Sequence, residues 1–338
     1  MSTSLKPLQP LALDDFVERD EKTRASARTA RVGRGVKQGS AQGEIDQHLQ
    51  ALRERQRLRA LEEQRIHENR VLQEILPLWD DDNRGVPNPL IRSGLFSVKK
   101  SDVREYVDIV VASLSNYRIT YRGEELQQDD LSVWLSLINL ARERPMSDSI
   151  YFSGYSLVKD PGWRMHSDSY LRAEGSIKRL KVTGLTISSP DGNEQYTGSL
   201  IREYAFKADD GSGNSRWMVR FEPKVSALFM EDTTTLLEWE VRKQIGARAT
   251  VALFLHSFYS SHAEPLPISV GKLHELSRSE DTVAGFKRTL LNALRKLEEV
   301  GFLSSYHLIG DLISVTKNKR PRLITAKKAG RTPRLKAS

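Results

Sequence analysis

The sequence predicts an α+β fold of two tandem winged-helix domains, because one order of short elements occurs twice along the chain. At residues 267–315, a short helix, a tight turn and a longer amphipathic helix precede two strands that meet at Gly310 and Asp311. At residues 150–221, a short strand, a short helix, a turn and a longer helix precede two or three strands. A helix-turn-helix with an attached β-ribbon is the element order of a winged helix. The copies share element order and not residue identity, so we predict tandem domains rather than a sequence repeat.

Helical periodicity marks the longer helix of each copy. The apolar stripe of the second copy recurs at helical spacing at Phe286, Leu290, Leu294 and Leu297. Ser279 is the predicted N-cap of this helix, and Gly301 follows as a stop signal. The longer helix of the first copy begins at Ser167 or Asp168. Its predicted core face consists of Tyr170, Ala173, Ile177 and Leu180.

The remaining elements of the folded part follow from local patterns. Strands are predicted at 107–114, 118–121, 150–152, 185–188, 196–206 and 216–221. Asp129 or Asp130 is the predicted cap of a helix whose apolar face holds Trp134, Leu137, Ile138 and Ala141. Further helices are expected at 224–231 and 247–261. Residues 84–98 contain two prolines and two glycines, so an extended loop is predicted there.

Composition divides the chain into five predicted parts. These are a disordered basic region (1–43), a helical extension or linker (44–85), a first winged-helix domain (86–235), a second (236–316) and a disordered basic tail (317–338). Arginines spaced through 24–34 could touch nucleic acid or could belong to a solvated tail. Residues 44–76 lack glycine and proline and favour a helix, either a solvated linker or a docking helix for a partner. Its heptad-like leucines change register midway, which argues against a sustained coiled coil.

Charge and cysteine content limit the classes of protein. The chain of 338 residues has a net charge of +8, but residues 317–338 carry nine basic residues and no acid. The rest holds 43 basic and 44 acidic residues, so DNA binding by the folded part must depend on where its cations lie. The absence of cysteine excludes disulfides and thiolate chemistry. Without an apolar run of membrane length, a cytoplasmic protein with no membrane partner is predicted.

A local excess of cations on the first long helix indicates DNA contact. Arg172, Gly175, Ser176 and Arg179 are predicted to share the face opposite the core stripe. Because the first turns of a recognition helix face base edges, Ser169, Tyr170 and Arg172 are candidate base readers. The candidate phosphate contacts are Lys178, Arg179 and Lys181. Gly175 either allows close approach of a phosphate or is merely tolerated in the helix.

The second long helix shows a similar pattern. Lys287 and Arg288 lie in its first half and acids lie at its end, which is the reverse of what the helix dipole favours. Arg278 in the preceding turn and Thr282 complete the predicted DNA-binding set. For any one of these residues an ordinary solvated side chain is the alternative. Two helices with cations at related places make coincidence a weaker explanation.

No catalytic or metal site is predicted. The seven histidines form neither H-x-H nor H-E-x-x-H, and neither a Walker A loop nor G-x-S-x-G occurs. We therefore expect no enzyme activity and no cofactor. In the 84–98 segment, Leu95 and Phe96 form an apolar pair. The pair either tucks into the core of its own domain or serves as a short linear motif for another protein.

Several longer segments resemble the TrfA family of plasmid replication initiators. They run in order from residue 86 to 268: VPNPLIRSGLF, RITYRGEELQQDDLSVW, GWRMHSDSYLRAEGSIKRL, SLIREYAF, ALFMEDTTTLLEWEVRKQI and HSFYSSHAEPLPI. The resemblance covers about residues 86–316 and leaves out the first 85 residues and the tail.

The resemblance implies a monomer that binds repeated origin sequences, called iterons, and a dimer that limits initiation and so copy number. It also implies melting of an AT-rich region, which would present single-stranded DNA, and recruitment of host DnaA, replicative helicase and sliding clamp. Clamp motifs of such proteins have the form Q-L-x-L-F; residues 92–96 read RSGLF, which keeps Leu95 and Phe96 without the leading Gln. The alternatives are a sequence-specific transcriptional repressor and a non-DNA adaptor.

Overall fold

The computed structural model describes residues 49–59, 61–62, 65, 76–101, 103–114, 117–188, 194–207, 216–229 and 233–318. The chain forms two compact units, Met1–Glu63 and Gln64–Ser338. In the first unit, residues 49–59 form a helix within the predicted 44–76 segment, and Leu49, Leu52 and Leu58 on it are exposed. The predictions for residues 1–43 and for the tail beyond residue 318 lie outside the described residues.

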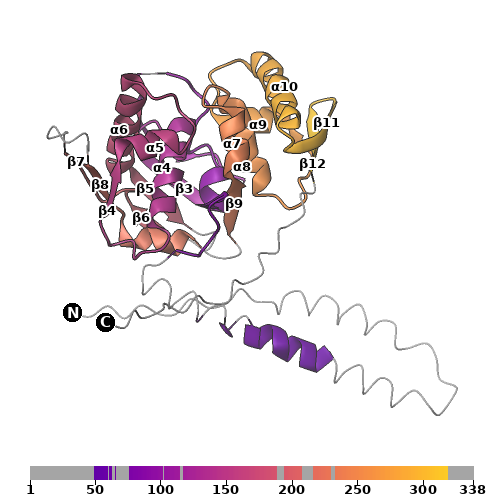
Figure 1. The fold of residues 1–338 in the computed structure, drawn as a ribbon. Coiled ribbons are helices and arrows are strands. Elements are labelled where there is room, and N and C mark those ends of the chain that lie inside the picture. Colours follow the sequence, from indigo (N-terminus) through magenta and orange to yellow (C-terminus); the bar gives the residue numbers. More distant parts are fainter. Residues whose placement is uncertain are drawn as a thin grey trace, which may run out of the picture. The chain divides into compact units, whose positions relative to one another are not determined.

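The second unit holds the mixed helix and sheet structure that the sequence predicts (Figure 1). Its helices are α3 (Asn88–Ile91), α4 (Gln128–Ala141), α5 (Gly154–Lys159), α6 (Ser167–Lys181), the 3-10 helix η1 (Pro223–Leu228), α7 (Trp239–Ile245), α8 (Thr250–Ser260), α9 (Val270–Ser277) and α10 (Val283–Glu299). Its strands are β1 (Asn83–Pro87), β2 (Tyr106–Val111), β3 (Arg118–Glu124), β4 (Ile150–Ser153), β5 (Gly184–Ser188), β6 (Glu194–Gly198), β7 (Glu203–Lys207), β8 (Arg216–Arg220), β9 (Thr234–Glu238), β10 (Ile268–Ser269), β11 (Leu303–Ile309) and β12 (Leu312–Lys317).

One arrangement of elements occurs twice in this unit. In residues 128–220, α4 is followed by β4, α5 and α6, then by β5 and β6 of another sheet, and then by the β7–β8 hairpin. β4 joins this hairpin in a sheet of order β4-β8-β7. In residues 250–317, α8 is followed by β10, α9, α10 and the β11–β12 hairpin, with the sheet order β10-β12-β11. We call these the N-terminal and the C-terminal module. In each, the strand before the helix pair hydrogen-bonds to the last strand of the hairpin.

The predicted strand at 196–206 is wrong, because the chain leaves one sheet and enters another within it. β6 pairs with β5 in a four-stranded sheet of order β2-β3-β5-β6, whereas β7 pairs with β8. Between them Leu200 and Ile201 are both fully buried. Two successive buried side chains break the alternation of a half-exposed strand. The first hairpin is therefore smaller than predicted, since β5 and β6 do not belong to it.

The predicted loop at 84–98 is also partly wrong. Residues 83–87 form β1, which pairs antiparallel with β9. α3 follows, with a proline in its first turn. Upstream of β1, the Trp79 ring stacks on Phe229, and its Nε1 donates to Asn139 Oδ1 at 3.0 Å. The prolines favour extended backbone as expected, but the partner strand lies about 150 residues away and has no local signal.

Apolar side chains gather in two cores. The first runs from Leu76 to Trp239 and includes the predicted α4 face of Trp134, Leu137, Ile138 and Ala141. The second contains the predicted α10 stripe of Phe286, Leu290, Leu294 and Leu297. Ala173, Ile177 and Leu180 of α6 are buried as expected, and Tyr170 is only half buried. The helical periods in the sequence therefore located the inner faces of these helices correctly.

A buried arginine on α7 joins the two cores. The Arg242 side chain donates to Ser132 Oγ and Gln128 Oε1 on α4, at 3.1 and 3.3 Å. It also donates to Ser257 Oγ and the Leu253 carbonyl on α8, at 2.9 and 3.3 Å. No carboxylate pairs with it among the described residues, so its guanidinium donates only to neutral hydroxyl, amide and carbonyl oxygens. Burial lowers the pKa of Arg242 to about 9, which leaves it charged at neutral pH.

We predict that Arg242→Ala lowers the free energy of unfolding by about 3 kcal/mol, because it leaves a cavity and buried acceptors without their donor. Urea denaturation of the purified chain measures this loss. Arg248→Ala is the matched control, since Arg248 is exposed nearby, and it should change stability by less than about 0.5 kcal/mol. Equal stability of the two variants would contradict the assigned role of Arg242.

Candidate nucleic-acid interface

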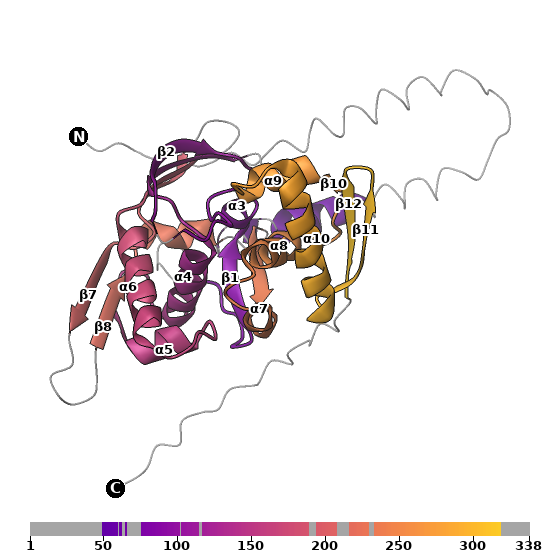
Figure 2. The same cartoon turned by 90° about the horizontal axis from the view of Figure 1, so that it is seen from above.

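The C-terminal module presents α10 beside the β11–β12 hairpin (Figure 1, Figure 2). Its N-cap is Thr282, whose Oγ1 accepts from the Gly285 backbone N–H at 3.2 Å. The predicted cap, Ser279, is wrong: its Oγ instead accepts from the Asp281 N–H at 3.3 Å within the turn. Thr282 is exposed, so its place at the start of the helix remains compatible with the predicted DNA contact.

The outward face of α10 carries one row of exposed side chains. These are Ala284, Arg288, Asn292, Arg295 and, at the end of the helix, Glu299. Arg295 Nη1 donates to Asn292 Oδ1 at 3.2 Å, and Arg288 has no ion pair among the residues that the structure describes. Lys287 is half buried and lies nearer the side of the apolar stripe. The predicted DNA-binding set included Arg288 but left out Asn292 and Arg295, although their helical spacing from Arg288 places them on its face.

On α6 the predicted DNA-facing side is wrong, because it packs against the beginning of α4 (Figure 2). Ser176 is fully buried. Arg172 Nε donates to Asp129 Oδ2 at 3.0 Å, and its guanidinium stacks over the Trp163 ring at 4.2 Å. Arg179 donates to Asp130 Oδ1 from Nε and Nη2, at 3.0 and 2.7 Å. Sequence periodicity found one buried face of α6 but could not show that a second helix covers the adjacent side.

The two aspartates are the centre of a buried charge cluster. Asp130 is not the N-cap but lies three residues inside α4, where its Oδ2 accepts from the Gln127 backbone N–H at 2.8 Å. Arg104 donates to Asp129 at 3.1 Å. Burial and the charge of Asp129 raise the pKa of Asp130. Burial also opposes the charge of Asp129, but Arg104 and Arg172 outweigh it and lower the pKa of Asp129.

The exposed face of α6 is therefore a different one from that predicted. Its exposed side chains are Leu171, Lys178 and the C-cap Val182, and Gly175 between them is half buried. Lys178 forms an ion pair with Glu174 at 2.5 Å. Among the other predicted contacts, Ser169, Tyr170 and Lys181 are half buried. The predicted α6 residues thus do not form one surface.

Arg278 is held by the N-terminal part of the unit. It follows α9 with φ of 52°, the one left-handed residue other than glycine among the described residues. Its Nη2 lies 2.7 Å from Oε1 of Glu125, which is 2% exposed. Lys99 bridges Glu125 and Glu280 at 3.2 and 3.0 Å. The turn between α9 and α10 is thereby fixed by two acids and two cations.

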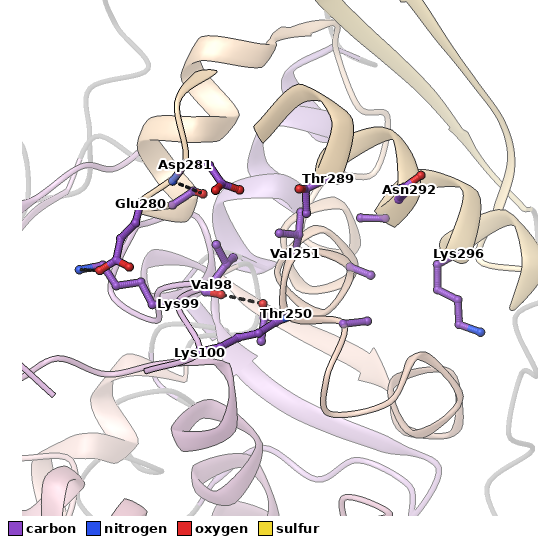
Figure 3. A pocket seen from close by; sticks show the side chains of 14 residues that line it. Val98, Lys99, Lys100, Thr250, Val251, Glu280, Asp281, Thr289, Asn292 and Lys296 are labelled. Atoms are coloured by element: carbon purple, nitrogen blue, oxygen red, sulfur yellow. Dashed lines mark hydrogen bonds and ion pairs between the residues drawn. The ribbon is translucent and has the colours of Figure 1, made fainter. Parts of the chain in front are cut away.

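A cavity of about 440 Å³ lies beside α10 (Figure 3). It is bounded by residues 98–100, the start of α8, the α9–α10 turn and one side of α10. Lys99 and Glu280 lie at one side of it and Lys296 at the other (Figure 3). The described residues contain no group of acids or histidines suited to hold a metal ion. Because the lining mixes acidic and basic side chains, it does not favour one class of ligand. We therefore do not assign the cavity a binding function.

Leu95 and Phe96 are both buried in the first core. Of the two alternatives for this pair, the structure shows packing within its own domain. Gln128 Nε2 also donates to the Phe96 carbonyl at 2.8 Å, which ties this segment to α4. Neither side chain is available to a partner in this arrangement.

The described residues define a class of protein: an α+β chain with two similarly ordered modules, each of which presents one long helix. None of the described helices is long and apolar enough to cross a bilayer. A family model for the TrfA protein matches residues 37–317. Because this match covers most of the sequence, the chain belongs to the TrfA family.

One curated relative is the plasmid replication initiator protein TrfA of Escherichia coli, 27% identical over 240 residues. The match covers 70% of this chain and 62% of the relative, which is less than two thirds of its length. Among solved structures, two crystal structures of domains 2 and 3 of RctB are similar, with TM-scores of 0.47 and 0.45 and 14% identity. They match 65% and 67% of this chain and 94% and 95% of their own.

We predict that Arg179→Met lowers the free energy of unfolding by about 3 kcal/mol, because it removes two hydrogen bonds and the nearest cation from the buried Asp130 carboxylate. Lys178→Met, one residue away, removes the same charge from an exposed pair and should cost less than about 0.5 kcal/mol. Urea denaturation compares the two. If Arg179→Met left stability intact and weakened only DNA binding, Arg179 would be the DNA contact that the sequence alone predicted.

Proposed function

We propose that this chain is a plasmid replication initiator whose two modules are winged helices that bind repeated duplex sequences at an origin. The observation that carries the proposal is the row of Arg288, Asn292 and Arg295 on the outward face of α10. Support comes from the family to which the chain belongs and from the sheet order of each module, in which a hairpin follows the helix pair. The domain boundaries predicted from the sequence, 86–235 and 236–316, remain predictions, and strand β9 (Thr234–Glu238) spans the boundary between them.

The chemistry of the α10 row suits the major groove. An arginine can donate two hydrogen bonds to guanine O6 and N7, and an asparagine can pair with adenine N6 and N7. Arg288 and Asn292 lie one helical turn apart, so they would face neighbouring base pairs. Lys287 and Arg278 lie at the margin of this face, where cations would meet phosphates, and Arg278 would keep its bond to Glu125.

Further steps of initiation are proposed from the family relationship. They are recruitment of host DnaA, replicative helicase and sliding clamp, exposure of AT-rich single strands, and a dimer that restrains initiation. Because Leu95 and Phe96 are buried, clamp binding through this pair would require residues 92–96 to leave the core. This function needs no catalytic step by the chain itself and places it in the cytoplasm.

We predict that Arg288→Ala and Asn292→Ala each weaken specific DNA binding by about ten- to a hundredfold, since a good base contact contributes about 1–3 kcal/mol. The probe is a duplex selected from a random pool by the whole chain, and fluorescence anisotropy measures its affinity. Arg122→Ala is the matched control, because Arg122 is an exposed arginine on β3, far along the chain from α10, and should bind like the wild type.

Wild-type affinity of both α10 variants would contradict the proposal. A repressor would bind DNA in the same way, so the second measurement is origin opening. Purified protein with host replication factors should melt a plasmid that carries the selected repeats beside an AT-rich segment. Tight binding without opening would favour the repressor.

A further inference from the structure

The outward face of α6 differs in chemistry from that of α10. Leu171 is 65% exposed and Val182 is 63% exposed, and Gly175 lies between them at helical spacing. The face therefore offers apolar side chains at its two ends, with Lys178 between them, where α10 offers arginine and asparagine. Both faces lie opposite the buried stripe of their helix, and both helices occupy the same place in their module.

Single exposed leucines are ordinary on protein surfaces, so exposure alone does not indicate that Leu171 binds a partner. The side chains around it must be considered as well. The two arginines that could have covered this face, Arg172 and Arg179, are bound to Asp129 and Asp130. Lys178 stands on the face, Lys181 lies beside it, and the exposed Arg164 precedes the helix. The local result is two apolar side chains with Lys178 between them and a cationic margin of Lys181 and Arg164. The acids beside them are Glu174, which pairs with Lys178, and Asp168.

Such a surface matches one feature of the DNA major groove. The thymine C5-methyl is the apolar group displayed there, and aliphatic side chains make contact with it. The cationic margin fits the flanking phosphates, and it would repel a basic protein partner. Leu171 and Val182 are separated by about 16 Å along the helix axis, a length that fits within a major-groove contact.

We propose that α6 reads thymine methyl groups through Leu171 and Val182. This rests on the proposed function, since it assigns the base chemistry of the N-terminal module. The two modules then recognise different features: α10 reads purine edges by hydrogen bonds, and α6 reads thymines by apolar contact.

The test replaces single thymidines by deoxyuridines in the duplex selected by the whole chain, because this change removes the methyl group and nothing else. Wild-type protein should lose about three- to tenfold in affinity at each contacted thymine. Leu171→Ala should bind the thymidine and deoxyuridine duplexes equally at one or more of these positions. Leu236→Ala, which truncates an exposed leucine on β9, should keep the wild-type sensitivity.

The remaining outcomes are also decisive. Deoxyuridine substitution without effect, or with an effect that Leu171→Ala retains, would overturn the proposal. Loss of a protein partner by Leu171→Ala with intact DNA binding would assign the face to that partner and overturn it as well. In each case, weaker binding by Arg288→Ala would leave the proposed function standing, whereas normal binding by that variant would remove the proposed function itself.

Discussion

The arrangement of the two modules depends on one buried charge. Arg242 lies on α7, between the first core, which includes Trp239, and the second, which includes Val241 and Ile245. Its guanidinium reaches oxygens on α4 and on α8 at the same time. A buried charge is costly unless its hydrogen bonds are made, so α4 and α8 cannot shift apart without stranding it. The Glu125–Arg278 pair adds a second link of this kind at the α9–α10 turn. The two long helices are thus presented by a joined scaffold rather than by independent domains.

The same stretch of sequence that supplies Glu125 also supplies Asp129 and Asp130, and these three acids bind Arg278, Arg172 and Arg179. Three of the cations that appeared suited to DNA therefore stabilise the protein itself. What distinguishes Arg288 from them is the lack of an acidic partner among the described residues, together with its exposure. A cation on a helix therefore indicates a DNA contact only when it is not already paired with a buried acid of the same protein.

Local signals explain what the sequence could predict. Apolar spacing located α4, α6, α8 and α10, and turn residues located the β11–β12 hairpin. The features that the sequence could not predict depend on contacts between residues far apart in the chain. The second buried side of α6 exists because α4 packs there, and Asp130 reveals its role only beside Arg179. Likewise β5 and β6 look like part of a hairpin until β2 and β3 are placed next to them. At the interface, the α10 row follows from periodicity, whereas the apolar face of α6 required knowing which arginines were already bound.

The β1–β9 pairing has a consequence for how the chain is made. Its register joins Asn83 to Glu238, so the first core lacks one of its strand pairs until more than 230 residues have left the ribosome. Structures with such distant pairings fold slowly, because the entropy cost of closing a long loop comes before the stabilising contacts form. The C-terminal module, by contrast, is contiguous from residue 250 to 317, and the outside residues in its core, such as Val98, Val241 and Ile245, precede it in the chain. Synthesis therefore exposes the apolar surface of the earlier part for longest, and the later module can complete its own structure soon after it emerges.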